Sequence, residues 1–247
     1  MNCKIVVNTE NEKLKNELKN IEAIFNSCKE NIHKARNEIK IIEINGRKYV
    51  AKSFKKPHII NRIAYTYLRG SKAEKSYENS LKIGDFAPNP IAYIEFFDNF
   101  LLSRSYFISD LFEYDFTIRE PLLDRNFPGR EMLLQEFAKF SYEMHEKNIF
   151  HNDYSPGNIL IKKEGSHYIF KVVDVNRMKF ISLGSQERAR NFSQLWANDD
   201  DLQIITEAYL QKYKTDEDFL AQTLYFSHQH KQRKNFKKRL KGEEIND

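Results

Sequence analysis

The segment from His151 to Leu160 constrains the fold more than any other part of the chain. Its sequence, HNDYSPGNIL, is rich in residues that form turns, so it interrupts regular structure on both sides. Before it, residues 130–147 place apolar side chains at spacings of three and four, which predicts a helix with one buried face. After it, residues 159–162 and 168–173 are predicted to form two short strands. We therefore expect a polar loop between a buried helix and a hairpin.

The first third of the chain is predicted to be rich in strands. Asn45-Gly46 is a strong signal for a two-residue hairpin turn, and strand-forming residues flank it on both sides. We expect strands at residues 38–44, 47–54, 91–97 and 102–108, a helix at residues 71–83 capped near Ser71, an amphipathic helical stretch within residues 1–27, and a basic connector with some helix at residues 58–69. After about residue 112 the chain is predicted to be mostly helical.

This order predicts an α+β protein of two lobes. The first lobe, residues 1–111, is expected to be rich in β structure with one embedded helix. The second lobe, residues 112–230, is expected to be mainly helical, and residues 231–247 are expected to form a basic tail. Ligands commonly bind in a cleft between two such lobes.

Four polar residues in and after the loop fit the chemistry of phosphoryl transfer. That reaction needs a carboxylate to accept the proton of the attacking hydroxyl, and oxygen ligands to hold Mg²⁺. Asp153 can be the base, and Asn158, five residues later, can reach a metal from the same loop. Asp174 follows an apolar strand that would hold it rigidly. His151 is expected to bond the backbone of the loop rather than to move protons.

These residues resemble the motifs of the protein-kinase-like superfamily. The spacing His151-x-Asp153-x₄-Asn158 is similar to the catalytic-loop pattern H-x-D-x₄-N, and Asp174 stands where the D of D-F-G normally stands. Upstream, Val50-Ala51-Lys52 is similar to the strand whose Lys contacts the α- and β-phosphates of ATP. The resemblance implies a two-lobed protein-kinase-like fold, with Asp153, Asn158 and His151 as catalytic residues and Asn158 and Asp174 as metal ligands.

Flanking stretches more closely resemble the lipopolysaccharide kinases that phosphorylate 3-deoxy-manno-octulosonic acid (Kdo) or heptose. They are residues 51–56, 61–67, 71–77, 88–95 and 144–176. The resemblance implies transfer of the γ-phosphate of ATP, with Mg²⁺, to a sugar hydroxyl on an anionic glycolipid. It also implies a hinge at residues 107–112, with Asp110, that receives the nucleotide, and a Glu that orients Lys52. Glu74 and Glu78 lie one helical turn apart, and we favour Glu78.

One departure from the kinase pattern is large. The segment Lys34-Ala35-Arg36-Asn37 precedes the first hairpin and contains no glycine, so the glycine-rich phosphate loop is missing. Arg36 is a candidate substitute for binding the nucleotide. Two alternatives stay open, and the missing loop supports the first of them. One is a pseudokinase that only binds ligands, and the other is a kinase for another small molecule or for a protein.

Charge and composition indicate where such a protein works. The chain has 40 basic and 35 acidic residues, and residues 231–241 carry seven Lys or Arg and no acid. This tail suits the anionic inner face of a membrane, although a solvated helical end is an equal alternative. Nucleic acid is not the expected partner. The small number of cysteines, with no apolar run of about 18 residues and no secretory leader, favours a cytoplasmic protein. The basic tail is the feature that suggests a peripheral position at the inner face of the inner membrane.

Overall fold

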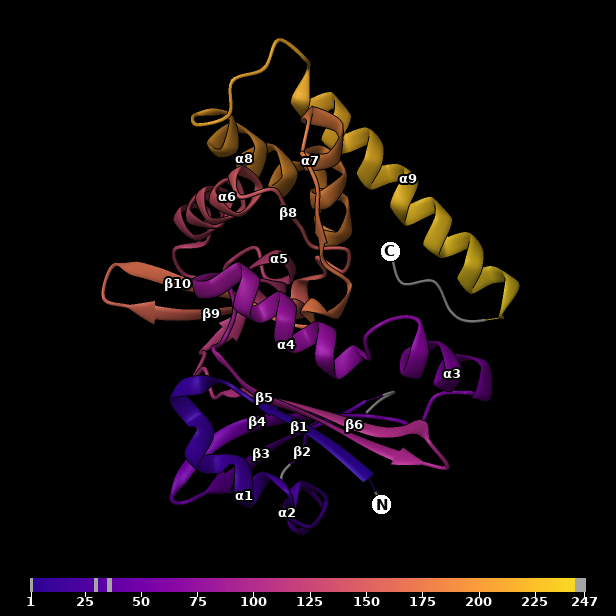
Figure 1. Cartoon of the computed structure of the whole chain (residues 1–247). Helices are drawn as coiled ribbons and strands as arrows, with labels where there is room; N and C mark the ends of the chain where they lie inside the picture. The colour runs from indigo at the N-terminus through magenta and orange to yellow at the C-terminus, as the bar shows by residue number, and fades with distance from the viewer. Residues whose placement is uncertain (1, 29–30, 35–36, 243–247) are drawn as a thin grey trace. The chain divides into compact units, whose positions relative to one another are not determined.

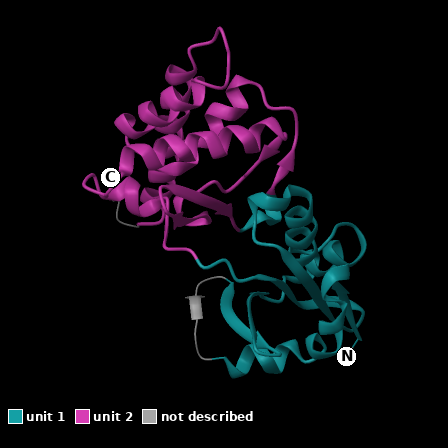
Figure 2. Ribbon diagram, turned by 90° about the vertical axis from the view of Figure 1, so that its left-hand side faces the viewer, with its two compact units in different colours: residues 1–113, 174–177 teal, residues 114–173, 178–247 magenta. Residues whose placement is uncertain are grey.

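The computed structural model describes residues 2–28, 31–34 and 37–242. The chain divides into two compact units: residues 1–113 with 174–177, and residues 114–173 with 178–247 (Figure 2). The first boundary lies two residues beyond the end of the lobe predicted at residue 111. The inclusion of residues 174–177 in the first unit has no counterpart in the sequence prediction.

The first unit is built on a six-stranded antiparallel sheet with the order β1-β5-β6-β4-β3-β2. Its strands are β1 (Asn2–Val7), β2 (Asn31–Lys34), β3 (Glu38–Ile44), β4 (Arg47–Phe54), β5 (Pro90–Asp98) and β6 (Leu101–Asp110). Its helices are α1 (Lys15–Leu18), α2 (Ile21–Ser27), α3 (Ile59–Tyr67) and α4 (Lys72–Ile83), with 3₁₀ turns η1 (Thr9–Leu14), η2 (Gly84–Phe86) and η4 (Val175–Arg177). The four strands predicted from the sequence are confirmed.

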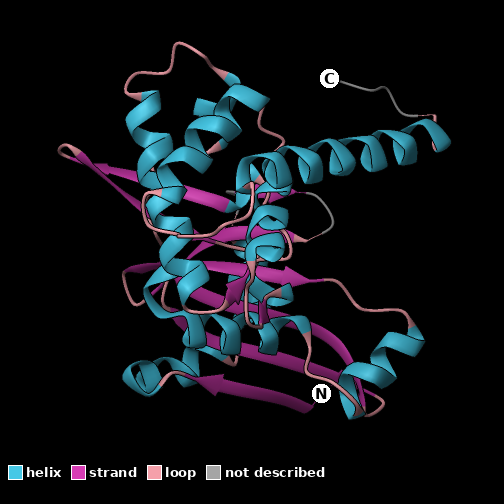
Figure 3. Ribbon diagram, turned by 90° about the horizontal axis from the view of Figure 1, so that it is seen from above, coloured by secondary structure: helices cyan, strands magenta, loops and turns pink. Residues whose placement is uncertain are grey.

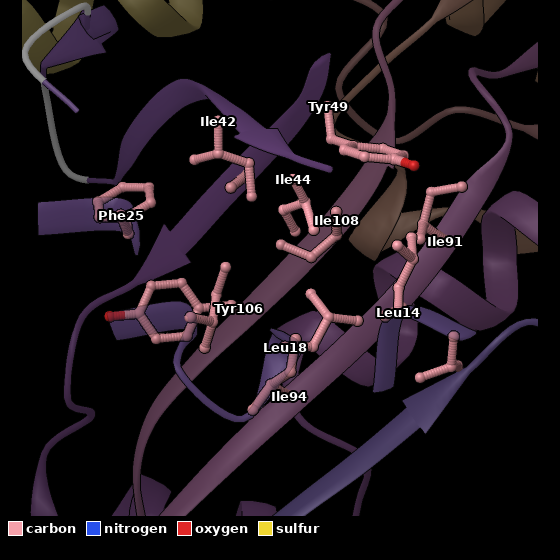
Figure 4. Close-up of a cluster of buried hydrophobic side chains, with 14 of the residues drawn as sticks. Leu14, Leu18, Phe25, Ile42, Ile44, Tyr49, Ile91, Ile94, Tyr106 and Ile108 are labelled. Carbon is pink, nitrogen blue, oxygen red and sulfur yellow. The ribbon is translucent and has the colours of Figure 1, made fainter. Parts of the chain in front are cut away.

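Both faces of this sheet are covered, which explains why β5 is buried along most of its length. Leu14, Leu18, Ile21 and Phe25 pack on one face, against strand residues such as Ile42 (Figures 1 and 4). On the other face α4 contributes Ala73 and Tyr77, which pack against Phe54 and Tyr93. The sheet therefore gains its hydrophobic stabilisation from two helical layers.

The start of the chain differs in part from the expectation of a helical stretch. Asn2 to Val7 forms β1, which pairs antiparallel with β5. Asn8 then stops the strand, because its side chain accepts a hydrogen bond from the backbone N–H of Glu10 and so caps η1. The predicted apolar stripe is buried as expected, but it is divided among η1, α1 and α2.

The second unit is mainly helical (Figure 3). Its helices are α5 (Arg119–Leu123), α6 (Arg130–Glu146), α7 (Ser185–Phe192), α8 (Asp199–Leu210) and α9 (Phe219–Leu240), with 3₁₀ turns η3 (Pro156–Asn158) and η5 (Ser193–Leu195). Its strands are β7 (Phe116–Thr117), β8 (Ile149–Phe150), β9 (Ile159–Glu164), β10 (His167–Val172) and β11 (Lys179–Phe180). Strands β10, β9 and β7 form one small sheet, and β11 and β8 form another. The predicted buried helix and the hairpin after the polar loop are confirmed.

The basic segment after residue 230 does not begin as a separate tail. It continues α9, whose 22 residues run to Leu240, and the Lys231 ammonium donates to the carbonyl of Ala197. Residues 243–247 of the predicted tail lie outside the described residues. Among the described helices, none combines the length and the apolar composition needed to cross a bilayer.

Candidate active site

The loop between β8 and η3 is organised around the side chain of His151. This imidazole is buried, with an exposed fraction of 1%. Its Nδ1 accepts the backbone N–H of Asp153 at 3.1 Å, so Nε2 carries the proton and donates to the carbonyl of Val173 at 2.9 Å. The expectation that His151 bonds backbone is confirmed. The ring ties the loop to the residue that immediately precedes Asp174 in the chain.

Asn158 closes the same loop from its other end. Its Nδ2 donates to the carbonyl of Asp153 at 2.9 Å, and its backbone N–H donates to the carbonyl of Ser155 at 2.9 Å. The backbone N–H of Val173 donates to the carbonyl of Asn158 at 2.9 Å. Because Nδ2 is committed within the loop, the amide oxygen is the atom of this side chain that can ligate a cation.

Two polar side chains from the second half of the chain form hydrogen bonds with the backbone of the loop. Asn191 on α7 donates from Nδ2 to the carbonyl of His151 at 2.9 Å. The amide oxygen of Gln194 in η5 accepts the backbone N–H of Tyr154 at 3.1 Å. Tyr154 is itself fully buried, and its hydroxyl bonds Ser141 on α6 at 2.8 Å. The backbone on both sides of Asp153 is thereby fixed.

Asn191 is the first member of a buried chain of hydrogen bonds that the sequence did not predict. Since Asn191 donates through Nδ2, its oxygen accepts from Nε2 of His145 at 3.0 Å. Nδ1 of His145 then accepts from the Tyr209 hydroxyl at 2.9 Å, and that hydroxyl accepts from Arg188 at 2.9 Å. Burial of the ring lowers the pKa of His145 from 6.5 to about 4. A neutral His145 is therefore part of the support for the loop.

In the first unit, Lys52 on β4 reaches Asp174. The two side chains form an ion pair, with Lys52 Nζ 2.7 Å from Asp174 Oδ1. Asn176 also donates to this oxygen, and Asp174 has a left-handed backbone with φ of 59°. The amide of Asn79 on α4 donates to the carbonyl of Val175 at 2.7 Å. The segment that follows Asp174 is thus anchored to the helix that covers the sheet.

Lys52 has a different partner from the Glu that the sequence favoured. Glu74 is engaged elsewhere: its Oε1 lies 2.9 Å from Lys4 Nζ and accepts the Tyr93 hydroxyl at 2.9 Å. Burial would raise the pKa of Glu74, but these two hydrogen bonds lower it overall. Glu78 is exposed on α4. Helical spacing placed both acids on α4 correctly, but it could not show that Lys4 on β1 takes Glu74.

Asp110 and Arg36 are the other residues that the sequence predicted to bind the nucleotide. Asp110, at the end of β6, pairs with Arg47 at 2.7 Å, and its backbone N–H donates to the carbonyl of Asn89 at 2.8 Å. It therefore lies within the predicted hinge, residues 107–112, near the point where the first unit's long segment ends at residue 113. Arg36 lies outside the described residues.

Gly157 lies close to a cation that spacing alone did not reveal. A Cβ built at this position would lie 2.7 Å from Nη2 of Arg119, which is closer than real Cβ contacts. The guanidinium of Arg119, at the start of α5, therefore lies against the loop between Asp153 and Asn158. A side chain at position 157 would move this guanidinium away from the loop.

The oxygen donors present suit Mg²⁺ better than a transition metal. The described residues contain no group of three or more His, Cys, Asp or Glu side chains that could hold a metal ion. Mg²⁺ needs no such cluster, because it is commonly held by one or two carboxylates together with substrate phosphates and water. Asp174 in the first unit and Asn158 in the second each offer an oxygen donor of this kind.

The fold of this chain is protein-kinase-like. It is similar to a solved structure of WaaP in complex with acyl carrier protein, with a TM-score of 0.61, 15% identity, and coverage of 93% of this chain and 98% of that one. A Rio2 kinase complex with ADP, Mg²⁺ and phosphoaspartate from Chaetomium thermophilum aligns with a TM-score of 0.49 and 16% identity, over 90% of this chain and 67% of that one.

A match to a family profile covers a shorter part of the chain than the match to the WaaP structure. Residues 118–214, which contain the whole loop, match the profile of the lipopolysaccharide kinase (Kdo/WaaP) family. The resemblance to lipopolysaccharide kinases predicted from the motifs is confirmed. These matches support a kinase, and hence a phosphotransferase. No curated protein matches the chain.

Proposed function

We propose that this protein transfers the γ-phosphate of ATP to a hydroxyl of a Kdo- or heptose-like sugar in the inner core of lipopolysaccharide. The observation that carries the proposal is the fixed loop around Asp153. His151 accepts the Asp153 N–H, and Asn158 donates to the Asp153 carbonyl. These two bonds fix the backbone of Asp153 and use neither of its carboxylate oxygens, so the side chain can act as a general base. The family match to residues 118–214 supports the choice of acceptor.

In the proposed reaction each group of the chain has one task. Asp153 accepts the proton of the sugar hydroxyl while the oxygen of that hydroxyl forms a bond to the γ-phosphorus of ATP. ADP leaves with the electrons of the broken P–O bond. Lys52 donates to the α- and β-phosphates with the N–H groups that its bond to Asp174 leaves available. Asp174 and the amide oxygen of Asn158 would hold Mg²⁺, which neutralises phosphate charge when bound.

The acceptor is proposed to be anionic and bound to lipid. Kdo carries a carboxylate, and inner-core sugars are attached to a phosphorylated lipid anchor. Arg119 lies against Gly157, in the same loop as the base, and so offers a cation to an acidic sugar. The WaaP structure was solved with acyl carrier protein, a partner of that protein. For this chain we propose a cytoplasmic location, with the acceptor presented at the inner membrane.

The direct test is a screen of ATP consumption against purified inner-core acceptors, in which mass spectrometry detects the addition of one phosphate. We expect Asp153→Asn to reduce turnover by at least about a hundredfold, because general-base catalysis contributes that much or more. Asp216→Asn, an exposed acid in the same unit, is the matched control and should keep full activity. Full turnover in Asp153→Asn would exclude its role as base.

A thermal-shift assay distinguishes an enzyme from a module that only binds ligands. A nucleotide that binds the folded state must raise the unfolding temperature. Stabilisation by Mg-ATP together with phosphate transfer supports the kinase. Stabilisation without transfer to any acceptor, or no stabilisation at millimolar nucleotide, favours a pseudokinase, the alternative suggested by the missing glycine-rich loop.

A further inference from the structure

Helix α3 turns its apolar side chains to solvent. None of its residues is buried. Ile60 is 78% exposed and Leu68, which caps the helix, is 81% exposed. The large exposed hydrophobic side chains of this segment are Ile59, Ile60, Ile63, Tyr67 and Leu68. At 100° per residue they share one broad side of the helix. Surface helices normally bury such a stripe against their own core, so this one is reversed.

The polar side of α3 is the side that anchors it. The guanidinium of Arg62 donates to the carbonyls of Leu102 at 2.7 Å and Asp98 at 2.9 Å. The Thr66 hydroxyl donates to the carbonyl of Arg62 at 2.7 Å and accepts the backbone N–H of Leu102 at 2.9 Å. These bonds fix the rotation of α3 about its axis. Arg62 is therefore committed to the hairpin backbone, and its side chain is only 12% exposed.

A second exposed apolar group lies at the hairpin to which α3 is tied. Phe100 occupies the two-residue turn between β5 and β6, is 80% exposed, and has φ of 63°. Asp98 and Leu101, whose carbonyls accept from Arg62, flank this turn. A bulky residue in the left-handed region is an outlier, and glycine is usual at this position of a tight hairpin turn. Folding alone therefore does not explain Phe100.

The surroundings of these apolar groups are basic. From residue 44 to residue 73 the chain contains eight Lys or Arg and no Asp or Glu. Lys55, Lys56 and Arg69, which flank α3 in the sequence, are exposed. Asp98, which lies beside α3, is already paired with Lys56 at 3.1 Å and with Arg62 at 3.7 Å. An apolar helix face with cations beside it is the pattern of helices that lie in the interface of an anionic bilayer.

We propose that α3 and the Asn99–Phe100 turn form a membrane-docking surface, called here the α3 surface, that binds anionic phospholipid. The isoleucines and Phe100 enter the boundary between headgroups and acyl chains, while Lys55, Lys56 and Arg69 contact phosphate. Charge decides against a second copy of the chain as the occupant, because pairing two α3 surfaces would bring like cations together. The surface lies within the first unit, and Figure 1 shows α3 beside the β5–β6 hairpin.

The experiment measures co-sedimentation of the full chain, without nucleotide, with vesicles of phosphatidylethanolamine and phosphatidylglycerol, and with vesicles of phosphatidylcholine alone. We expect binding to the anionic vesicles, weakened by salt, and a loss of at least about tenfold in the double variant Ile60→Glu/Leu68→Glu. Leu123→Glu is the matched control, since Leu123 on α5 is 78% exposed and belongs to the other unit. It should bind as the unchanged chain does.

A second variant separates this surface from the basic end of α9. Lys234→Glu/Lys237→Glu reverses two exposed cations there and should keep most of the binding. Absence of vesicle binding by the unchanged chain, or equal binding by Ile60→Glu/Leu68→Glu, would overturn the proposal. So would loss of binding confined to the α9 variant, or a dimer that the α3 variant dissociates. Asp153→Asn should bind vesicles normally, so this test fails or succeeds independently of the proposed phosphotransfer.

Discussion

The ion pair between Lys52 and Asp174 leads to a prediction at the scale of single residues. Lys52→Met should weaken Mg-ATP binding by about 2 kcal/mol, or about thirtyfold in Kd, because it removes a hydrogen bond from a charged donor to phosphate. Lys48→Met, an exposed Lys on the same strand and the same side of the pleat, is the control. Isothermal titration calorimetry with Mg-ATP checks the difference. Equal affinities in the two variants would remove Lys52 from the nucleotide site.

His145 should make stability depend on pH. The pKa of this buried ring is about 4 in the folded chain and near 6.5 when exposed, so the unfolded chain binds more protons between these values. Stability should therefore fall as pH drops from 6.5 towards 4, by up to about 1.4 kcal/mol per pH unit, and should not change above 6.5 on this account. The facing groups are Tyr209 and Asn191, with Arg188 beyond them. Urea unfolding across this range should show a smaller slope for His145→Gln, and an unchanged slope would contradict the assignment.

At the scale of elements, two hairpin turns of one sheet provide a matched comparison. Asn45-Gly46 and Asn99-Phe100 both connect neighbouring strands by two residues with positive φ. Phe100→Gly should stabilise the chain by roughly 0.5 to 1 kcal/mol, because relief of left-handed strain exceeds the added entropy of the unfolded glycine. Gly46→Phe should destabilise it. Denaturant midpoints check both signs. If Phe100→Gly is more stable and also binds anionic vesicles less well, then Phe100 lowers the stability of the hairpin and contributes to membrane binding.

At the scale of the whole molecule, the chain path couples the folding of the first unit to sequence beyond it. Residues 174–177 belong to that unit although the second unit surrounds them in sequence. Val175 is buried, and its carbonyl accepts from Asn79 on α4. A fragment of residues 1–113 lacks this segment and should show faster amide exchange in α4 than the full chain does. The strand β3 provides the internal comparison. Equal protection of α4 in both forms would mean that η4 contributes little to the unit.

Local pattern was sufficient to predict much of the fold and the residues of the loop. The hairpin at Asn45-Gly46, the capped helix at Ser71 and the buried face of α6 depend on side chains within one or two turns of each other. The spacing of His151, Asp153 and Asn158 is of the same kind, because all three act within one loop. Short-range geometry limits such segments to few conformations, so the sequence predicts them well.

Which distant side chains meet was decided only by the tertiary structure. The sequence showed two candidate acidic partners for Lys52, Glu74 and Glu78, and placed Asp174 at a spacing that fits the kinase pattern. Packing decided that Lys4 takes Glu74 and that Lys52 takes Asp174. It also decided that α3 is anchored by Arg62 and carries its apolar face outward, whereas periodicity alone predicts the reverse. The physical reason is that a charged or apolar group contacts whichever partner the folded backbone brings near it. Local spacing along the chain does not specify that partner.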